Sequence, residues 1–177
     1  MKSLMDYIQE KLTIKENKNV DYKYFPKTKK ELKEIISQRI NDEGSEVDLN
    51  DIDVSNIKDM SNLFSRKDFN GDISNWDVSN VTDMGDMFVD CFRFNKDISS
   101  WDVSNVKNMS EMFIGCGKFN SDISNWNVSN VTDMTSMFNG CKSFNQDISK
   151  WNVSKVKDHY FMFSNCGIQD KYKPKFK

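Results

Sequence analysis

Apolar and polar positions recur along most of this chain with a period of 25 residues. The segment DISNWDVSNV at 72–81 returns almost unchanged at 97, 122 and 147. A degenerate copy, VDLNDIDVSNIKDMSNLF, precedes them at 47–64. A fixed period of about 20 to 50 residues is typical of repeat proteins, in which each unit buries its apolar side by stacking on the next. We therefore predict five stacked coils over roughly residues 45–169.

The pattern changes within one copy. Trp76 and Val78 alternate with polar residues, which favours a short strand. Apolar residues from Val81 to Phe88 then recur at three- and four-residue steps, which favours a short helix with Ser79 as its N-cap. The predicted fold class is an α/β solenoid, leucine-rich-repeat-like, with about five strand-plus-short-helix coils, one parallel sheet and an N-terminal capping helix.

The segment before the repeats carries both signals of a helix. Thr28 and Glu31 form a capping box, and Gly44 is a natural stop. An apolar stripe that includes Leu32 and Ile36 would cover the open end of the first coil. The predicted organisation is an amphipathic helix at 1–14, a linker at 15–27, the capping helix at 28–44, the repeats at 45–169 and a basic tail at 170–177.

Two resemblances accompany these patterns. The consensus F-N-x-D-I-S-x-W-[DN]-V-S-N-V-x-[DN]-M-x-x-M-F-x-x-C resembles the BspA-like leucine-rich repeats of mycoplasma and gut-bacterial proteins. That resemblance implies a strand-lined face and a role in binding other macromolecules. Residues 1–14 are weakly similar to head-targeting peptides of tailed-phage internal proteins, which implies cleavage after Glu10; the alternative is a helix packed on the domain.

Charge and composition limit the classes of partner that we expect for this protein. The formal net charge is −2, so nucleic acid is not expected as a partner. Residues 45–165 carry 18 acidic and 11 basic side chains, and basic side chains predominate in both flanks. No run approaches the roughly 20 apolar residues that span a membrane, and the charged start does not resemble a secretion signal. The predicted location is cytoplasmic, with a virion or infected-host cytoplasm as alternatives, and no membrane partner is expected.

The cysteines share one phase of the repeat: Cys91, Cys116, Cys141 and Cys166. Their position beside the Met-Phe pairs predicts buried, reduced thiols. Zinc sites use closely spaced ligands such as C-x₂₋₄-C, which are missing here. The single histidine, His159, has no identifiable catalytic partner. The prediction is a protein without enzymatic activity or cofactor and with no assigned metal site, while Ca²⁺ binding by the column of Asp53, Asp77 and Asp102 remains an alternative.

Polar columns complete each copy. The column Asp48, Asp72, Asp97, Asp122, Asp147 is predicted to bond turn amides, and Asn70, Asn95, Asn120 and Asn145 to form a hydrogen-bonded ladder. The tryptophans are predicted to be core. Outward strand positions define a candidate binding face, which consists of Asp53, Asn75, Asp77, Ser100, Asp102, Asn125, Asn127, Lys150 and Asn152.

The predicted function is protein binding through this acidic and polar face, to a partner with a basic patch. A phage-encoded protein that acts on a host protein, such as a defence enzyme, fits that frame. The alternatives are a phage virion protein packaged through its N-terminal peptide and a bacterial surface adhesin. A further alternative is a purely structural repeat whose acidic face contacts only solvent. The sequence does not specify the oligomeric state.

Overall fold

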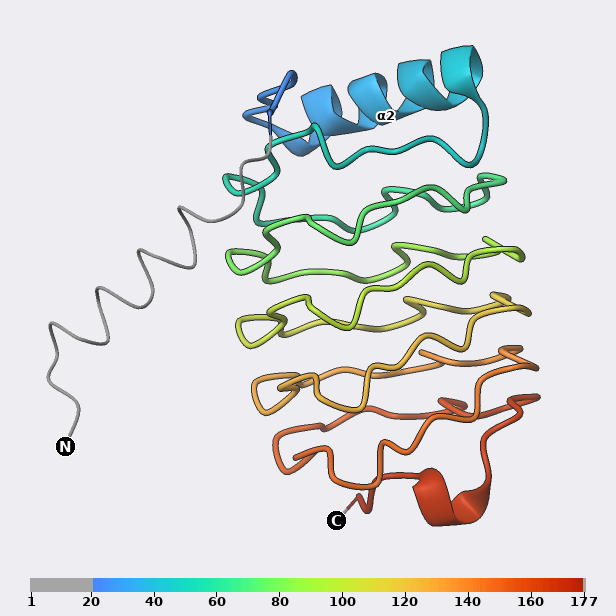
Figure 1. Ribbon diagram of the computed structural model, residues 1–177. Helices are drawn as coiled ribbons and strands as arrows, with labels where there is room; N and C mark the ends of the chain where they lie inside the picture. The colour runs from blue at the N-terminus through green and yellow to red at the C-terminus, as the bar shows by residue number, and fades with distance from the viewer. Residues whose placement is uncertain (1–20, 177) are drawn as a thin grey trace, which may run out of the picture.

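The computed structural model describes residues 21–176, in which successive copies of the repeat lie on one another as coils (Figure 1). Hydrogen bonds join backbone groups 23 to 26 residues apart throughout the stack, for example from Met84 N–H to the Asn108 carbonyl at 3.0 Å. Helix α2 (Lys29–Glu43) lies across one end. A short 3₁₀ helix, η1 (Asp170–Tyr172), lies near the other end.

The predicted α/β solenoid of strand-plus-helix coils is wrong. Within residues 21–176, α2 is the one α-helix, and it precedes the repeats. The described coils contain no named strand; only isolated parallel bridges join them, such as Asp83 to Asn108 and Asn108 to Asp133. The bridge column also lies seven residues after the tryptophan column, in the segment for which the pattern favoured a helix.

Tight turns explain the misread pattern. Trp76 N–H donates to the Ile73 carbonyl at 3.2 Å, which closes a four-residue turn where a strand was expected. The same bond recurs later in the coil, from Val81 to Val78, Met87 to Met84, Cys91 to Phe88 and Phe94 to Cys91. Apolar residues therefore recur every three positions because they end turns, and a three-residue step imitates a helical stripe over so short a window.

Aromatic rings and thiols fill the interior of the stack. Phe88 and Phe94 stack within one coil with centroids 4.1 Å apart, and Phe88 stacks on Phe113 of the next coil at 5.5 Å. The Trp101 indole N–H donates to the Ile73 carbonyl at 3.1 Å, and its ring stacks on Trp126. All four tryptophans are at most 5% exposed, which confirms the prediction that they are core.

Helix α2 closes the first coil. The Thr28 hydroxyl accepts a hydrogen bond from the Glu31 N–H at 3.2 Å, and Leu32 and Ile36 are fully buried against the coil. Arg39 donates to both carboxylate oxygens of Asp51, at 2.9 and 3.1 Å, and to the Asp48 carbonyl at 2.9 Å. Two buried apolar side chains and the Arg39–Asp51 ion pair, in which Nη1 donates to both oxygens, therefore fix the helix on the stack.

Candidate functional site

Short polar turns shape the candidate face. Asp77 Oδ1 accepts from the Ser79 N–H at 3.1 Å and from the Ser79 hydroxyl at 2.6 Å. The equivalent bonds from Ser104 to Asp102 and from Ser129 to Asn127 measure 3.1 and 3.2 Å. A side-chain oxygen that accepts the N–H two residues on is an Asx turn. Hydrogen bonds within the coil therefore fix the side chains of this column. The predicted strand would have left them free to point outward.

The remaining members of the face lie on the surface with varied partners. Asn75, Ser100, Asn125 and Lys150 are exposed. The Asn75 N–H donates to Asn50 Oδ1 at 2.8 Å, and the Ser100 hydroxyl donates to the Ser74 carbonyl at 2.9 Å. Asp53 and Asn152 make the same Asx turns as their column neighbours, with Ser55 and Ser154. None of the nine candidates is buried, while Glu10 lies outside the described residues.

The charge of this face changes along the stack. Asp53, Asp77 and Asp102 supply carboxylates in the first three coils, and Asn127 and Asn152 replace them in the last two. None of the three carboxylates pairs with a cation among residues 21–176. The pKa of Tyr22 is raised, chiefly by partial burial and then by the charges of Asp53 and Asp77, so this phenol lies within their field.

Other polar columns stabilise the coils. Asp72 and Asp122 accept from Ser74 and Ser124 at 2.9 Å, which confirms the turn-amide role. The Asn95 N–H donates to Asn70 Oδ1 at 3.0 Å, and the bond repeats from Asn120 to Asn95 at 2.8 Å. The predicted asparagine ladder is thus confirmed, although its members lie at the surface.

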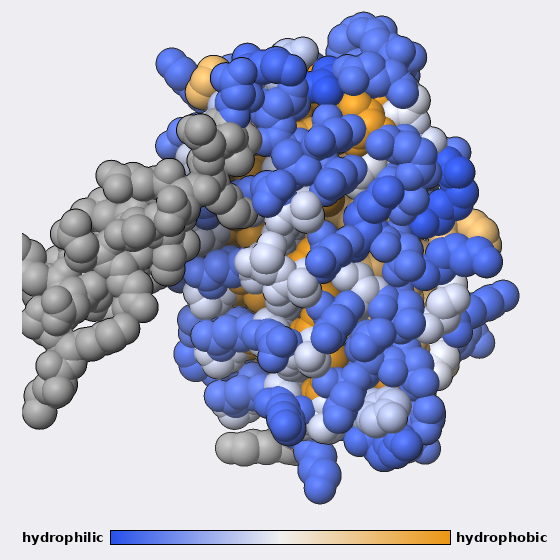
Figure 2. Space-filling model, in the orientation of Figure 1, coloured by the Kyte–Doolittle hydropathy of each residue, from blue (hydrophilic) through white to orange (hydrophobic). Residues whose placement is uncertain are grey.

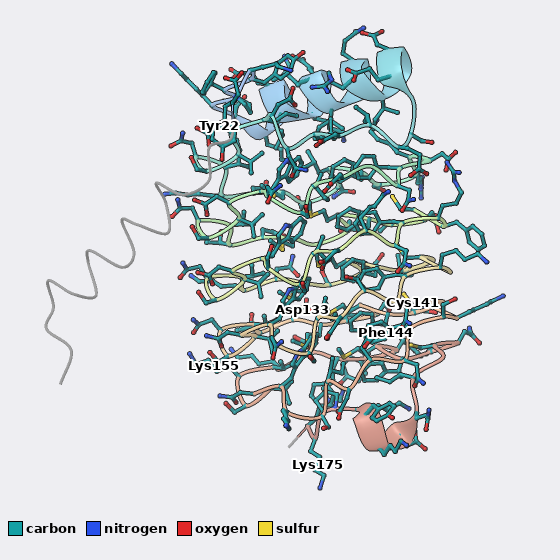
Figure 3. All side chains as sticks on the ribbon, in the orientation of Figure 1. Tyr22, Asp133, Cys141, Phe144, Lys155 and Lys175 are labelled. Carbon is teal, nitrogen blue, oxygen red and sulfur yellow. The ribbon has the colours of Figure 1, made fainter. Side chains whose placement is uncertain are left out.

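The thiols of the cysteine column have low reactivity. Cys91, Cys116 and Cys141 are buried free thiols, as predicted, whereas Cys166 is half-buried. The Cys141 thiol donates to the Phe113 carbonyl at 2.9 Å, and Figure 3 shows Cys141 beside Phe144 within the stack. Burial raises the pKa of the Cys91 thiol to about 12. A neutral, buried thiol is a poor nucleophile, so this column packs the coils.

Sequence reasoning missed an aromatic cluster at the C-terminal end. Tyr160 and Phe161 are 69% and 72% exposed, and Phe176 stacks on His159 with centroids 4.0 Å apart. The signal was present in the columns: Phe161 replaces Asp86, Glu111 and Ser136, and His159 replaces Met84, Met109 and Met134. Figure 2 shows a contrasting side of the molecule, on which hydrophilic side chains predominate.

Stacked copies of one 25-residue unit with a shared hydrogen-bond register define a repeat protein. The chain belongs to the family described as Mycoplasma protein of unknown function, DUF285, whose model matches residues 30–123 and again 101–173. No curated protein and no solved structure matches the chain. The two overlapping family matches extend from within α2 to the end of η1.

Residues 21–176 contain no candidate for a metal site or a membrane-spanning helix. No group of three His, Cys, Asp or Glu side chains in residues 21–176 could hold a metal ion. In the same residues, no helix is both long enough and apolar enough to cross a membrane.

Proposed function

We propose that the protein is a non-enzymatic binding module whose candidate face docks a partner protein with a basic patch. The column of Asp53, Asp77 and Asp102 carries this proposal. Asn127 and Asn152 form the same Asx turn through an amide oxygen, so the turn needs an oxygen and not a charge. Stacked like charges repel one another. A negative charge that the fold does not need, in three successive coils, is a feature suited to a cationic partner.

The resemblance to BspA-like repeats supports the same function, because such proteins generally bind macromolecules. The repeated backbone also favours it, since equivalent side chains fall into rows and give an extended surface of constant geometry. The hypotheses of a packaged phage protein and of cleavage after Glu10 rest on residues 1–14, which the family match does not include. No described residue favours these or the adhesin hypothesis.

Charge-removing substitutions test the face without breaking its turns. Asp77→Asn with Asp102→Asn keeps both Oδ1 acceptors and removes two charges; replacement by lysine would remove the acceptors as well. The matched control, Asp86→Asn with Glu111→Gln, removes two charges from half-buried positions of the bridge segments, which are residues 83–90, 108–115 and their equivalents in the other coils. Each protein is immobilised, incubated with a lysate of the source organism and washed with increasing salt.

We expect the wild-type protein to retain a partner that salt releases, and the face variant to lose it at lower salt than the control. A photoreactive residue at Asn125 should crosslink to the same partner, and one at Ser110 should not. Equal loss in both double variants, or retention unaffected by either, would contradict the proposed face.

A further inference from the structure

The bridge segments give the stack a direction. In the second coil, four alternate residues donate their N–H groups to carbonyls of the third coil. These bonds run from Met84 to Asn108, Asp86 to Ser110, Phe88 to Met112 and Asp90 to Ile114, at 2.8 to 3.0 Å. The second and fourth donor residues, Asp86 and Asp90, both have a positive φ of 58°. Along this segment the donors therefore all point toward the C-terminal end of the stack.

Among residues 21–176, no full coil lies beyond the last one to accept these bonds, although the tail pairs with this coil where the Ile148 N–H donates to the Tyr172 carbonyl at 3.0 Å. The last coil's equivalent donors are the N–H groups of His159, Phe161, Phe163 and Asn165, which we call the C-terminal edge. None of the four has a hydrogen-bond acceptor among residues 21–176. An ordinary sheet edge alternates donors and acceptors. This edge is a row of donors, so it is complementary to a row of carbonyl oxygens.

The opposite end of the stack carries the complementary groups but is covered. The first-coil carbonyls equivalent to those acceptors belong to Asp59, Ser61, Leu63 and Ser65. Helix α2 lies on this side: Lys29 Nζ contacts Asp59 Oδ1 at 3.0 Å, and Lys67 Nζ donates to the Ser37 hydroxyl at 3.2 Å. A second copy would therefore have to displace α2 before it could offer these carbonyls, and two C-terminal edges would meet donor to donor.

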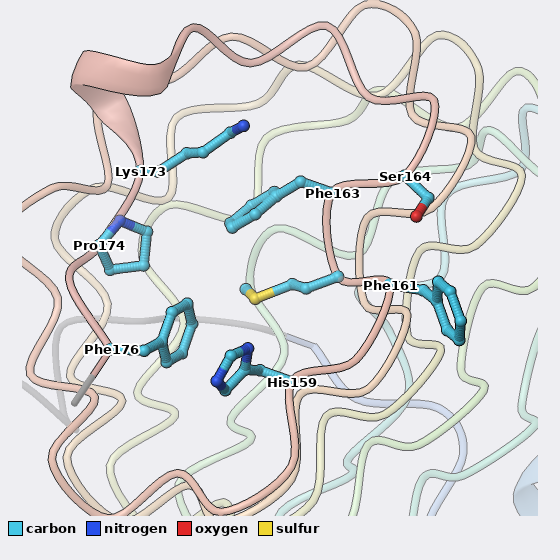
Figure 4. Close-up of a pocket in the computed structure, with 8 residues that line it drawn as sticks. His159, Phe161, Phe163, Ser164, Lys173, Pro174 and Phe176 are labelled. Atoms are coloured by element: carbon cyan, nitrogen blue, oxygen red, sulfur yellow. The ribbon is translucent and has the colours of Figure 1, made fainter.

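A hollow beside the edge leaves room for side chains. His159, Met162 and Phe163 form one wall, and Lys173, Pro174 and Phe176 of the tail form the other (Figure 4). The cavity has a volume of about 340 Å³. Phe161 also lines this cavity, and its side chain is largely exposed. The edge thus offers apolar surface next to its row of unpaired donors.

We propose that the C-terminal edge docks a segment of a different polypeptide, which takes the coil conformation and presents alternate backbone carbonyls to the four donors. Main-chain pairing of this kind gives affinity, and pockets for alternate side chains give specificity, as when a peptide extends a sheet. The segment would displace Phe176, which stacks on His159, and would cover His159 and the Phe161 ring with a sixth coil. This surface is separate from the candidate face, so either proposal can fail alone.

The protein's own repeat supplies a probe. A peptide with the sequence of residues 131–141, blocked at both ends and with serine at the Cys141 position, corresponds to a segment that already offers suitable carbonyls. Those of Asp133, Thr135, Met137 and Asn139 accept from the third coil at 2.8 to 3.0 Å. Added to the full chain, this peptide should slow hydrogen exchange at the amides of the C-terminal edge. The Met162 amide, which already donates to the His159 carbonyl at 3.2 Å, is the internal control.

A substitution sharpens the test. His159→Met restores the residue of the buried column Met84, Met109, Met134, and we expect it to tighten peptide binding by about tenfold through apolar burial. The pair Asp77→Asn and Asp102→Asn should leave peptide binding unchanged. Failure to bind, binding equal to that of a scrambled peptide, or exchange protection away from the four amides would overturn the proposal. Protection that rises with protein concentration alone would assign the edge to a second copy instead.

Discussion

One side-chain atom, the Oδ1 oxygen of aspartate or asparagine, shapes the first four coils at three places each and the last coil at two. In the second coil, Asp72, Asp77 and Asp83 accept from the N–H groups of Ser74, Ser79 and Gly85 at 2.8 to 3.1 Å. Each bond fixes a turn that the backbone alone would leave free. The pattern D-x-[SG] therefore predicts a turn at these positions. It also explains why aspartate and asparagine exchange within a column without loss of the local structure.

Among single residues, Trp101 should show the largest stability effect. Trp101→Ala removes a 4%-exposed ring, its stack on Trp126 and the donor to the Ile73 carbonyl. We expect the free energy of unfolding to fall by about 3–5 kcal/mol, measured by urea denaturation. Asp77→Asn should change it by less than about 0.5 kcal/mol, because Oδ1 remains. The reverse order would mean that the tryptophan column does not hold the coils together.

Acid should weaken the turns of the Asp122 column. The backbone N–H and then the hydroxyl of Ser124 lower the pKa of Asp122 in the folded protein. Because the folded pKa is lowered, ionised Asp122 stabilises the folded protein fully above the unfolded pKa of about 3.9. This stabilisation is lost as the pH falls through the folded pKa. Asp122→Asn keeps the acceptor but cannot titrate, so it should show a smaller loss of stability between pH 7 and pH 3. Parallel pH profiles for the two proteins would contradict this account.

At the scale of elements, the sequence predicted positions better than conformations. The column register placed Trp101, Cys116 and Asn95 correctly, because burial and coil-to-coil bonds depend only on the repeat period. The strand and helix predictions failed for a local reason. A two-residue step seen once, at Trp76 and Val78, and three-residue steps between turn ends carry too few periods to distinguish strand or helix from a chain of turns.

The sequence predicted that the candidate residues are not buried, but it did not predict the Asx turns of their aspartate and asparagine column. The outward positions follow from the tryptophan register, yet the Asx bond of Asp102 depends on a backbone turn that the strand model excluded. The sequence did not predict the C-terminal edge, for a related reason. Its donors belong to the backbone of His159, Phe161 and their neighbours, and only the positive φ values of the bridge segments point them all one way.

These positive φ values make a separate prediction for the turns. Gly140 has φ of 79°, and the nearest heavy atom to a Cβ built there would be 3.4 Å away, so alanine adds strain without a severe clash. Gly140→Ala should lower the free energy of unfolding by about 1–2 kcal/mol. Gly140→Asn should cost less, since asparagine tolerates this region and Asn165 occupies the equivalent position with φ of 52°. Equal melting temperatures for Gly140→Ala and wild type would contradict the turn assignment.

At the scale of the whole molecule, the two ends of the stack differ in what they expose. Helix α2 covers a row of carbonyl oxygens, whereas the C-terminal edge leaves its N–H donors open. Lysines also gather at the open end: Lys155, Lys157, Lys171 and Lys175 are exposed there, and Figure 3 shows Lys155 and Lys175 on its periphery. The stack is therefore polar along its axis, and α2 prevents the complementary ends of two copies from meeting.

Loosening α2 should remove that protection. Leu32→Lys with Ile36→Lys places charges on the two fully buried positions of the helix, so the helix should detach while the coils below it remain stacked. The exposed first-coil carbonyls could then accept from the C-terminal edge of another copy, and we expect head-to-tail association that increases with protein concentration, measured by sedimentation velocity. The control Lys33→Glu with Glu34→Lys exchanges exposed charges on the same helix and should leave the sedimentation coefficient unchanged. Circular dichroism separates association from unfolding, and a folded double variant that does not associate at any concentration would show that the covered carbonyls and the open donors are not complementary surfaces.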